Sequence, residues 1–178
     1  MLKNFIFYGS IFLGAFIAPI IGMGLVGWFL DPYHEVSSTA RYQSSVEEVW
    51  EVISDFEKSA EWRESVEAVK KGGIEDGHQI WVEVHGPREI PLAVTAFEPN
   101  RRFVMETARD DMPFSGSWTF EVREDGRGSA LTITERATIG NPVFRFMSRY
   151  FLGHHTSVDT YHQDLARRLG QSVEPVHH

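Results

Sequence analysis

Two polar residues interrupt otherwise apolar patterns, and they are the main candidates for chemistry in this sequence. Glu135 shares the face of a strand-like segment with Ile133, and His154 lies on the apolar stripe of a C-terminal helical pattern. A carboxylate and an imidazole that face one apolar space could act as general acid and base, or orient the polar group of a ligand. In the alternative, Glu135 pairs with Arg145 or Arg149 to pin the helix, and His154 bonds a backbone carbonyl.

Several large apolar residues lie on the same faces of the predicted strands and could surround Glu135 and His154. Phe103 and Met105 lie on one face of a strand, as do Trp118 and Phe120 on another, because side chains alternate across a strand. They predict an apolar cavity between a sheet and the C-terminal helix, and the alternative is a filled core without space for a ligand. The predicted ligand-binding residues are Phe103, Met105, Trp118, Phe120, Ile133, Glu135, His154 and Val158.

Other patterns of potential catalytic or metal-binding residues are weaker. His155, Asp159 and His162 recur at helical spacing, but no fourth ligand is evident, and we expect the three side chains to face water. Glu83 and His85 lie on one strand, where we expect them on the outer face of the sheet. The sequence therefore predicts no metal site and no cofactor.

Composition excludes several classes of function. The 178 residues contain 17 Lys and Arg against 25 Asp and Glu, a formal net charge of −8, whereas a nucleic-acid partner requires a basic face. The chain has no cysteine, which excludes disulfides, thiolate metal sites and cysteine nucleophiles. A hydrophobic content of 42% indicates a folded protein.

The elements that must position the candidate residues form an α+β pattern. A strand at 34–43 precedes a capping box, Ser45 with Glu48, which begins a helix, and a second short helix follows at 58–65. Turn residues then separate six further strands, which predicts an antiparallel sheet. These strands are expected at 66–71, 78–85, 90–97, 102–108, 114–123 and 129–138. One long helix over 142–170 would lie across the curled sheet.

The N-terminal segment has the composition of a membrane anchor. Residues 4–30 contain no charged side chain, and 5–30 is long enough for one transmembrane helix. A buried core helix and a cleaved signal peptide are the alternatives. Because Lys3 precedes the segment and acidic residues follow it, we expect the domain on the non-cytoplasmic side of the membrane.

Small residues recur every four positions within this segment. Ser10, Gly14, Ala18 and Gly22 form a stripe that lets two membrane helices approach closely, so a homo-oligomer is one expected assembly. The expected organisation is an anchor and juncture at 1–33, a domain at 34–170, and a frayed C-terminal tail at 171–178.

Several motifs, taken in order, are similar to those of a known superfamily. They are Ser45-Val46-Glu47-Glu48-Val49-Trp50, Ile53-Ser54-Asp55-Phe56, Glu61-Trp62, Ile133-Thr134-Glu135, Asn141-Pro142 and Arg145. Over residues 34–170 this order resembles the START-like or SRPBCC superfamily, often labelled polyketide cyclase/dehydrase and lipid transport proteins. The resemblance implies a helix-grip fold, with a seven-stranded antiparallel sheet around the C-terminal helix, and the binding of hydrophobic ligands; a minority of members are enzymes.

The expected function is therefore membrane-anchored binding of a hydrophobic small molecule or lipid. One alternative is an enzyme of the polyketide cyclase or dehydratase type that uses Glu135 and His154. Another is an assembly module that holds no ligand.

Overall fold

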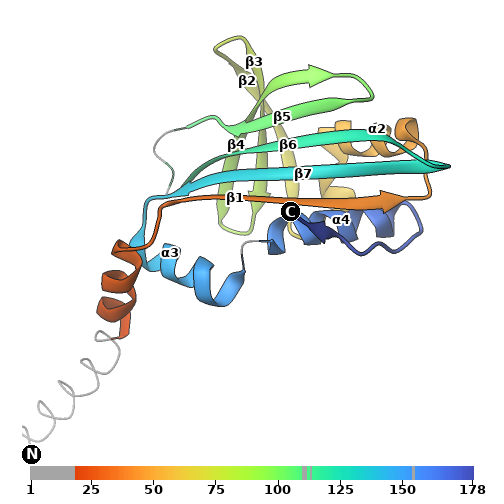
Figure 1. Ribbon diagram of the computed structural model, residues 1–178. Helices are drawn as coiled ribbons and strands as arrows, with labels where there is room; N and C mark the ends of the chain where they lie inside the picture. The colour runs from red at the N-terminus through yellow and green to blue at the C-terminus, as the bar shows by residue number, and fades with distance from the viewer. Residues whose placement is uncertain (1–18, 110–111, 113, 154) are drawn as a thin grey trace, which may run out of the picture.

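A computed structural model describes residues 19–109, 112, 114–153 and 155–178 (Figure 1). The helical elements are α2 (Val46–Ser54), the 3₁₀ helix η1 (Phe56–Glu61), α3 (Pro142–Met147), the π-helix η2 (Ser148–Leu152) and α4 (Thr156–Arg168). The strands are β1 (Tyr33–Tyr42), β2 (Ala68–Glu75), β3 (His78–His85), β4 (Arg88–Glu98), β5 (Arg102–Thr107), β6 (Phe114–Asp125), β7 (Gly128–Ile139) and β8 (Val176–His177).

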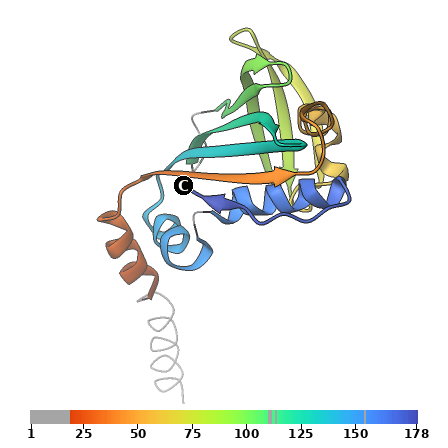
Figure 2. The same ribbon diagram turned by 45° about the vertical axis from the view of Figure 1, so that its right-hand side comes forward.

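The strands form one antiparallel sheet in the order β2-β3-β4-β5-β6-β7-β1-β8. The sheet curls over α2 and α4, as Figures 1 and 2 show, which confirms the α+β architecture of a sheet that grips a C-terminal helix. The capping box is also confirmed, because the Glu48 amide donates to Ser45 Oγ and the Ser45 amide donates to the Glu48 carboxylate.

Among the residues that the structure describes, the sheet has eight strands, so the predicted number of seven is wrong. The eighth comes from the C-terminal tail, where Val176 and His177 pair with the otherwise open edge of β1. His177 Nε2 also lies 2.9 Å from a carboxylate oxygen of Asp159, and Gln171 accepts a 2.8 Å hydrogen bond from the Gln43 amide. The tail is therefore held by partners distant in the sequence, and the expected frayed end was wrong.

The C-terminal helical segment is broken, which corrects the prediction of one continuous helix. The chain passes from α3 into η2, closes η2 with a 3.2 Å bond from the Gly153 amide to the Ser148 carbonyl, and resumes as α4 at Thr156. Gly153 has φ +76, a left-handed conformation that an α-helix does not allow. The break therefore divides the segment into an arm, formed by α3 and η2, and the helix α4 that the sheet grips.

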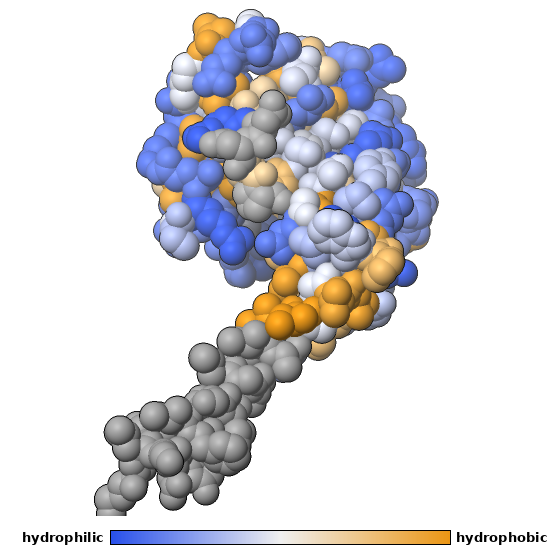
Figure 3. Space-filling view, turned by 90° about the vertical axis from the view of Figure 1, so that its left-hand side faces the viewer, coloured by the Kyte–Doolittle hydropathy of each residue, from blue (hydrophilic) through white to orange (hydrophobic). Residues whose placement is uncertain are grey.

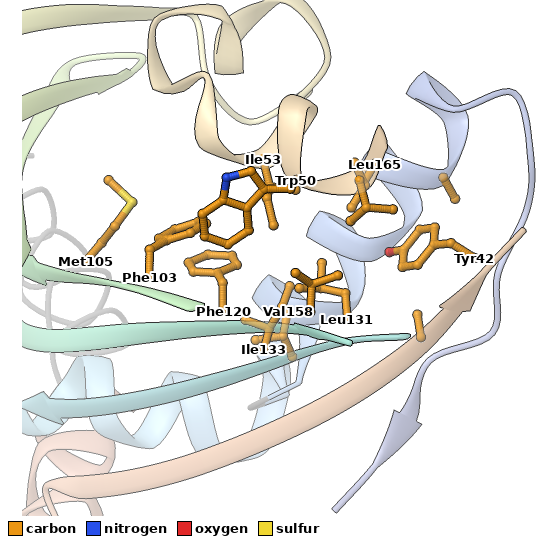
Figure 4. Close-up of a cluster of buried hydrophobic side chains, with 14 of the residues drawn as sticks. Tyr42, Trp50, Ile53, Phe103, Met105, Phe120, Leu131, Ile133, Val158 and Leu165 are labelled. Carbon is orange, nitrogen blue, oxygen red and sulfur yellow. The ribbon is translucent and has the colours of Figure 1, made fainter. Parts of the chain in front are cut away.

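The core is packed solidly at the end of the sheet where α2 meets α4. Phe103 and Phe120 stack with ring centroids 4.4 Å apart, and Trp50 of α2 meets Phe103 edge-on at 5.8 Å. Figure 4 shows these rings between the sheet and α2, with Leu165 of α4 beside them. This cluster closes one end of the space between sheet and helices.

His162 corrects a second expectation, because its side chain is fully buried rather than facing water. Its Nε2 lies 3.4 Å from the Ser38 carbonyl oxygen, which can only accept, and its Nδ1 lies 2.9 Å from the Tyr42 hydroxyl. Both ring nitrogens are thus used by a neutral imidazole. Burial lowers the pKa of His162 from its ordinary 6.5 to about 4.

This buried imidazole predicts a loss of stability in mild acid. The unfolded chain takes up a proton at His162 near pH 6.5, whereas the folded chain does so only near pH 4. The free energy of unfolding is therefore expected to fall by up to about 3 kcal/mol as the pH drops through this window. Urea unfolding in detergent micelles at several pH values measures this slope, and His162→Gln should flatten it; an equal slope in both proteins would contradict the assignment.

The predicted anchor is described only from residue 19 onward. Residues 19–28 are helical, and Leu25, Trp28 and Phe29 are exposed, so for this part a buried core helix was wrong. Among the residues that the structure describes, no helix is both long and apolar enough to cross a bilayer. Of the predicted small-residue stripe, Ser10, Gly14 and Ala18 lie outside the described residues, and a Cβ at Gly22 would meet open space.

Candidate ligand cavity

A cavity of about 690 Å³ lies between the concave face of the sheet and the two parts of the C-terminal helical segment. This volume is in the range of small-molecule sites, so the filled-core alternative was wrong. Lining residues reach the surface at the junction of η2 and α4, where Phe144, Gly153 and Thr156 are exposed, and also at Ser65 and Arg88. The cavity ends inside the protein at the packed cluster of α2 (Figure 4).

The structure brings the predicted residues together around this cavity. Seven of the eight line it, six chosen by strand parity and Val158 by the apolar stripe of the helix: Phe103, Met105, Trp118, Phe120, Ile133, Glu135 and Val158. The eighth, His154, lies outside the described residues. Most of the lining is apolar, and two groups of polar side chains interrupt it.

The first polar group is centred on Glu135, which is buried on β7. Trp118 Nε1 donates to Glu135 Oε2 at 3.0 Å, the Ser157 hydroxyl of α4 donates to the same oxygen, and His34 Nε2 lies 3.4 Å from Oε1. The expected partner Arg145 is not involved, because its guanidinium donates to backbone carbonyls, among them that of Ile139. The partners of Glu135 thus come from β1, β6 and α4 and hold these elements around one carboxylate.

These contacts decide the charge of Glu135. Burial alone would raise the pKa of this carboxyl, but the hydrogen bonds from His34, Ser157 and Trp118 outweigh burial and lower its pKa below the ordinary value. Glu135 is therefore ionised at neutral pH. It can accept a hydrogen bond from a ligand or act as a general base, but it has no proton to donate as a general acid.

The second polar group, Arg63 with Glu83 and His85, was missed at the level of sequence. Arg63 Nη1 donates to the Glu83 carboxylate, His85 Nε2 lies 3.0 Å from the other Glu83 oxygen, and the guanidinium carbon stands 5.1 Å from the ring centroid of Tyr161. The expectation that Glu83 and His85 face outward was wrong. Trp81, which has the same parity and contacts Phe56 at 5.8 Å, was the available signal that this face points inward.

Charge is balanced within this second group. Burial would raise the pKa of Glu83, but Arg63 and His85 outweigh it and hold the pKa below the ordinary value. Three carboxylates thus line the cavity, those of Glu83, Glu135 and Asp164, within walls that are mostly aromatic and aliphatic, and each accepts at least one hydrogen bond, Asp164 from the Glu64 amide. No group of three or more His, Asp or Glu side chains in the described part of the chain could hold a metal ion. Such a chamber suits an apolar ligand with few polar atoms.

Solved structures with the same fold have little sequence identity to this chain. A START superfamily protein from Mycobacterium smegmatis matches with a TM-score of 0.61 and 15% identity over 77% of this chain and 97% of its own. A conserved protein from Geobacillus kaustophilus gives 0.62 and 14%, over 82% and 100%. The Zhui aromatase/cyclase from a Streptomyces species gives 0.57 and 12%, over 77% and 96%. At these identities the likeness concerns the fold alone.

Sequence comparison identifies the family. No relative is found among curated protein sequences. The sequence profile described as polyketide cyclase / dehydrase and lipid transport matches residues 33–172, which include all of the sheet except β8 and the whole arm and α4. This range nearly coincides with the 34–170 over which the motifs were matched. The chain therefore belongs to the polyketide cyclase/dehydrase and lipid transport family.

Proposed function

We propose that this protein is a membrane-anchored binding protein that holds a hydrophobic small molecule or lipid between its sheet and α4. The observation that carries the proposal is the largely apolar cavity of about 690 Å³, open at the junction of η2 and α4. The family description, which includes lipid transport, supports it. The charge-free residues 5–30 would supply the anchor, with the domain on the non-cytoplasmic side.

Photo-crosslinking with a neutral alkyl diazirine tests this proposal. The full chain, in detergent micelles, is irradiated with the probe, and labelled peptides are mapped by mass spectrometry. If the cavity binds apolar molecules, labels will appear on peptides that contain Met105, Trp118 and Val158, all of which line it. Labels confined to residues 5–30 would show that the probe meets only the anchor, and the proposal would fail.

A second candidate function is an enzyme, favoured by the ionised carboxylate of Glu135 inside the cavity. In that case Glu135 would be the base, and His154 is the sequence-based candidate for the acid. The family description also names cyclases and dehydrases.

Glu135→Gln separates the two functions even when the ligand is unidentified. The amide keeps an acceptor for Trp118 and Ser157 but cannot take up a proton as the carboxylate does. For a binding protein, we expect the same compound to be extracted from the wild type and from the variant, with affinity reduced by no more than about fivefold, because one neutral hydrogen bond contributes about 1 kcal/mol. Extraction of one compound from the wild type and of a chemically different precursor from the variant would instead support the enzyme.

A further inference from the structure

An apolar surface lies beside the opening of the cavity. We call it the juncture face; it consists of Ile21, Leu25, Trp28 and Phe29 on the N-terminal side with Phe144, Tyr150 and Phe151 of the arm. All seven side chains are exposed, Phe29 to 87% and Phe151 to 66%. Figure 3 shows hydrophobic residues gathered where the N-terminal helix meets the globular domain. An apolar patch of this kind on a folded domain marks a surface that has a partner.

Close contacts fix the N-terminal helix against the arm. A Cβ at Gly27 would lie 1.9 Å from the Pro142 carbonyl oxygen, so only glycine allows this approach. Arg145 Nη1 donates to the carbonyls of Gly27 at 3.2 Å and of Leu30 at 2.9 Å, which caps the C-terminal end of the helix over 19–28. Figures 1 and 2 both show this helix beside α3. The two halves of the juncture face therefore form one continuous surface.

The charge of this surface differs from that of the rest of the chain. The formal net charge of the whole protein is −8, yet residues 142–152 contain Arg145 and Arg149 and no acidic residue. Arg149 is exposed next to Tyr150, and the rings of Tyr150 and Phe151 both contact Phe146, at 4.9 and 6.1 Å. Aromatic rings with neighbouring cations are typical of segments that lie in the headgroup layer of a membrane.

The arm also forms part of the cavity wall. Phe144 and Ser148 line the cavity, and so does Gly153, which ends the arm in its left-handed conformation. The exposed side of the arm and the opening of the cavity therefore lie on the same part of the molecule. Any surface that binds the exposed side of the arm would therefore also lie at the opening of the cavity.

We propose that the juncture face lies in the headgroup layer of a lipid bilayer, so that the cavity opens toward the membrane and exchanges apolar molecules with it directly. The inference rests on the proposed function, because it takes residues 5–30 as the anchor in the same bilayer. The continuity of the juncture face with that charge-free segment selects a bilayer over a second copy of the chain as the partner.

Single labels in the cysteine-free chain test this orientation. An environment-sensitive fluorophore is attached to Phe151→Cys in the full chain, reconstituted into nanodiscs with and without lipids that carry a quencher. The matched controls are Leu25→Cys in the anchor half and Ile74→Cys at the β2–β3 end, where the native side chain is 73% exposed. We expect quenching by lipid at position 151 to exceed that at 74 by about threefold or more, and quenching by aqueous iodide to show the reverse order.

The outcomes separate this inference from the proposed function. A label at 151 that iodide reaches as freely as at 74, or that neither quencher reaches, as at a contact with another protein, would overturn the inference. Lipid quenching at 25 without quenching at 151 would overturn the inference while leaving the anchor intact, because the arm would then lie away from the bilayer. Quenching at 151 without quenching at 25 would contradict the anchor and would also overturn the inference, because Leu25 belongs to the juncture face; only the arm would then contact lipid. Tyr150→Cys repeats the measurement at a second exposed position of the arm.

Discussion

Replacing Ala137 with phenylalanine is expected to reduce ligand binding by about tenfold or more, an affinity loss of about 1.4 kcal/mol or greater. Ala137 is buried on β7, lines the cavity and lies two residues from Glu135. A benzyl group at this position would occupy the space of the ligand, and binding would require the walls to move apart. The yield of diazirine cross-links to Met105 and Trp118 measures the effect.

The adjacent residue on β7 provides a matched control. Thr138 points to the opposite side of the strand and is exposed, so Thr138→Phe adds a ring of similar size outside the cavity. We expect cross-linking to Met105 to equal that of the wild type in this variant. If both variants retain full yield while their melting curves show that they are folded, the probe binds elsewhere and the account of the cavity fails.

Removing the charge of Arg63 is expected to have the largest effect on stability. The side chains of Arg63 and Glu83 are only 17% and 8% exposed, so Arg63→Leu leaves a buried carboxylate with His85 as its remaining partner. Loss of one member of a buried ion pair destabilises proteins by about 3–5 kcal/mol. Urea unfolding of the full chain in detergent micelles measures this loss.

A double variant identifies the cause of that destabilisation. In Arg63→Leu with Glu83→Leu, both charges of the pair are absent, and we expect most of the stability to return because the buried Glu83 carboxylate that lost its partner is gone as well. Glu83→Leu alone should be destabilising as well, since it leaves the guanidinium buried beside Tyr161. A double variant no more stable than Arg63→Leu would show that the loss comes from packing rather than from charge.

Local patterns in the sequence account for most of the fold. Turn residues and alternation predicted β1 to β7, whose ends differ from those expected by at most two residues except at the end of β2, but not β8. Asn141 and Pro142 marked the start of the C-terminal helical segment, and Asn141 Oδ1 accepts hydrogen bonds from the amides of Val143 and Phe144. Strand parity then placed six side chains on the cavity wall, and the apolar stripe of the helix placed Val158 there.

The partners of the polar residues depend on packing that no local pattern encodes. Glu135 is bonded by His34, which lies 101 positions earlier, and by Ser157, which lies 22 positions later on a separate helix. Glu83 meets Arg63, which lies 20 positions earlier and on the other side of strand β2 in the sequence, and Trp81 was the available local sign of which face of β3 is buried. These contacts follow from the curl of the sheet rather than from spacing along the chain.

The cavity itself is the feature that the sequence predicts least well. The same strand parity fits a filled core and a hollow one, because parity gives the direction of a side chain and not the distance to its partner. The break at Gly153 contributes to this cavity because it turns the arm away from the axis of α4. Helix α2 and its packed cluster fill only the opposite end of the space between the sheet and the helices. One glycine in an otherwise helical pattern was the only local sign of this arrangement.

Native mass spectrometry of the detergent-purified full chain tests the central claim most directly. We expect the wild type to retain one adduct with the mass of a lipid or another hydrophobic molecule per chain after the detergent is removed in the gas phase. The adduct should persist in Thr138→Phe and be lost from Ala137→Phe, whose added ring occupies the cavity. A wild-type chain that carries no adduct, or an adduct equally abundant in both variants, would contradict the account.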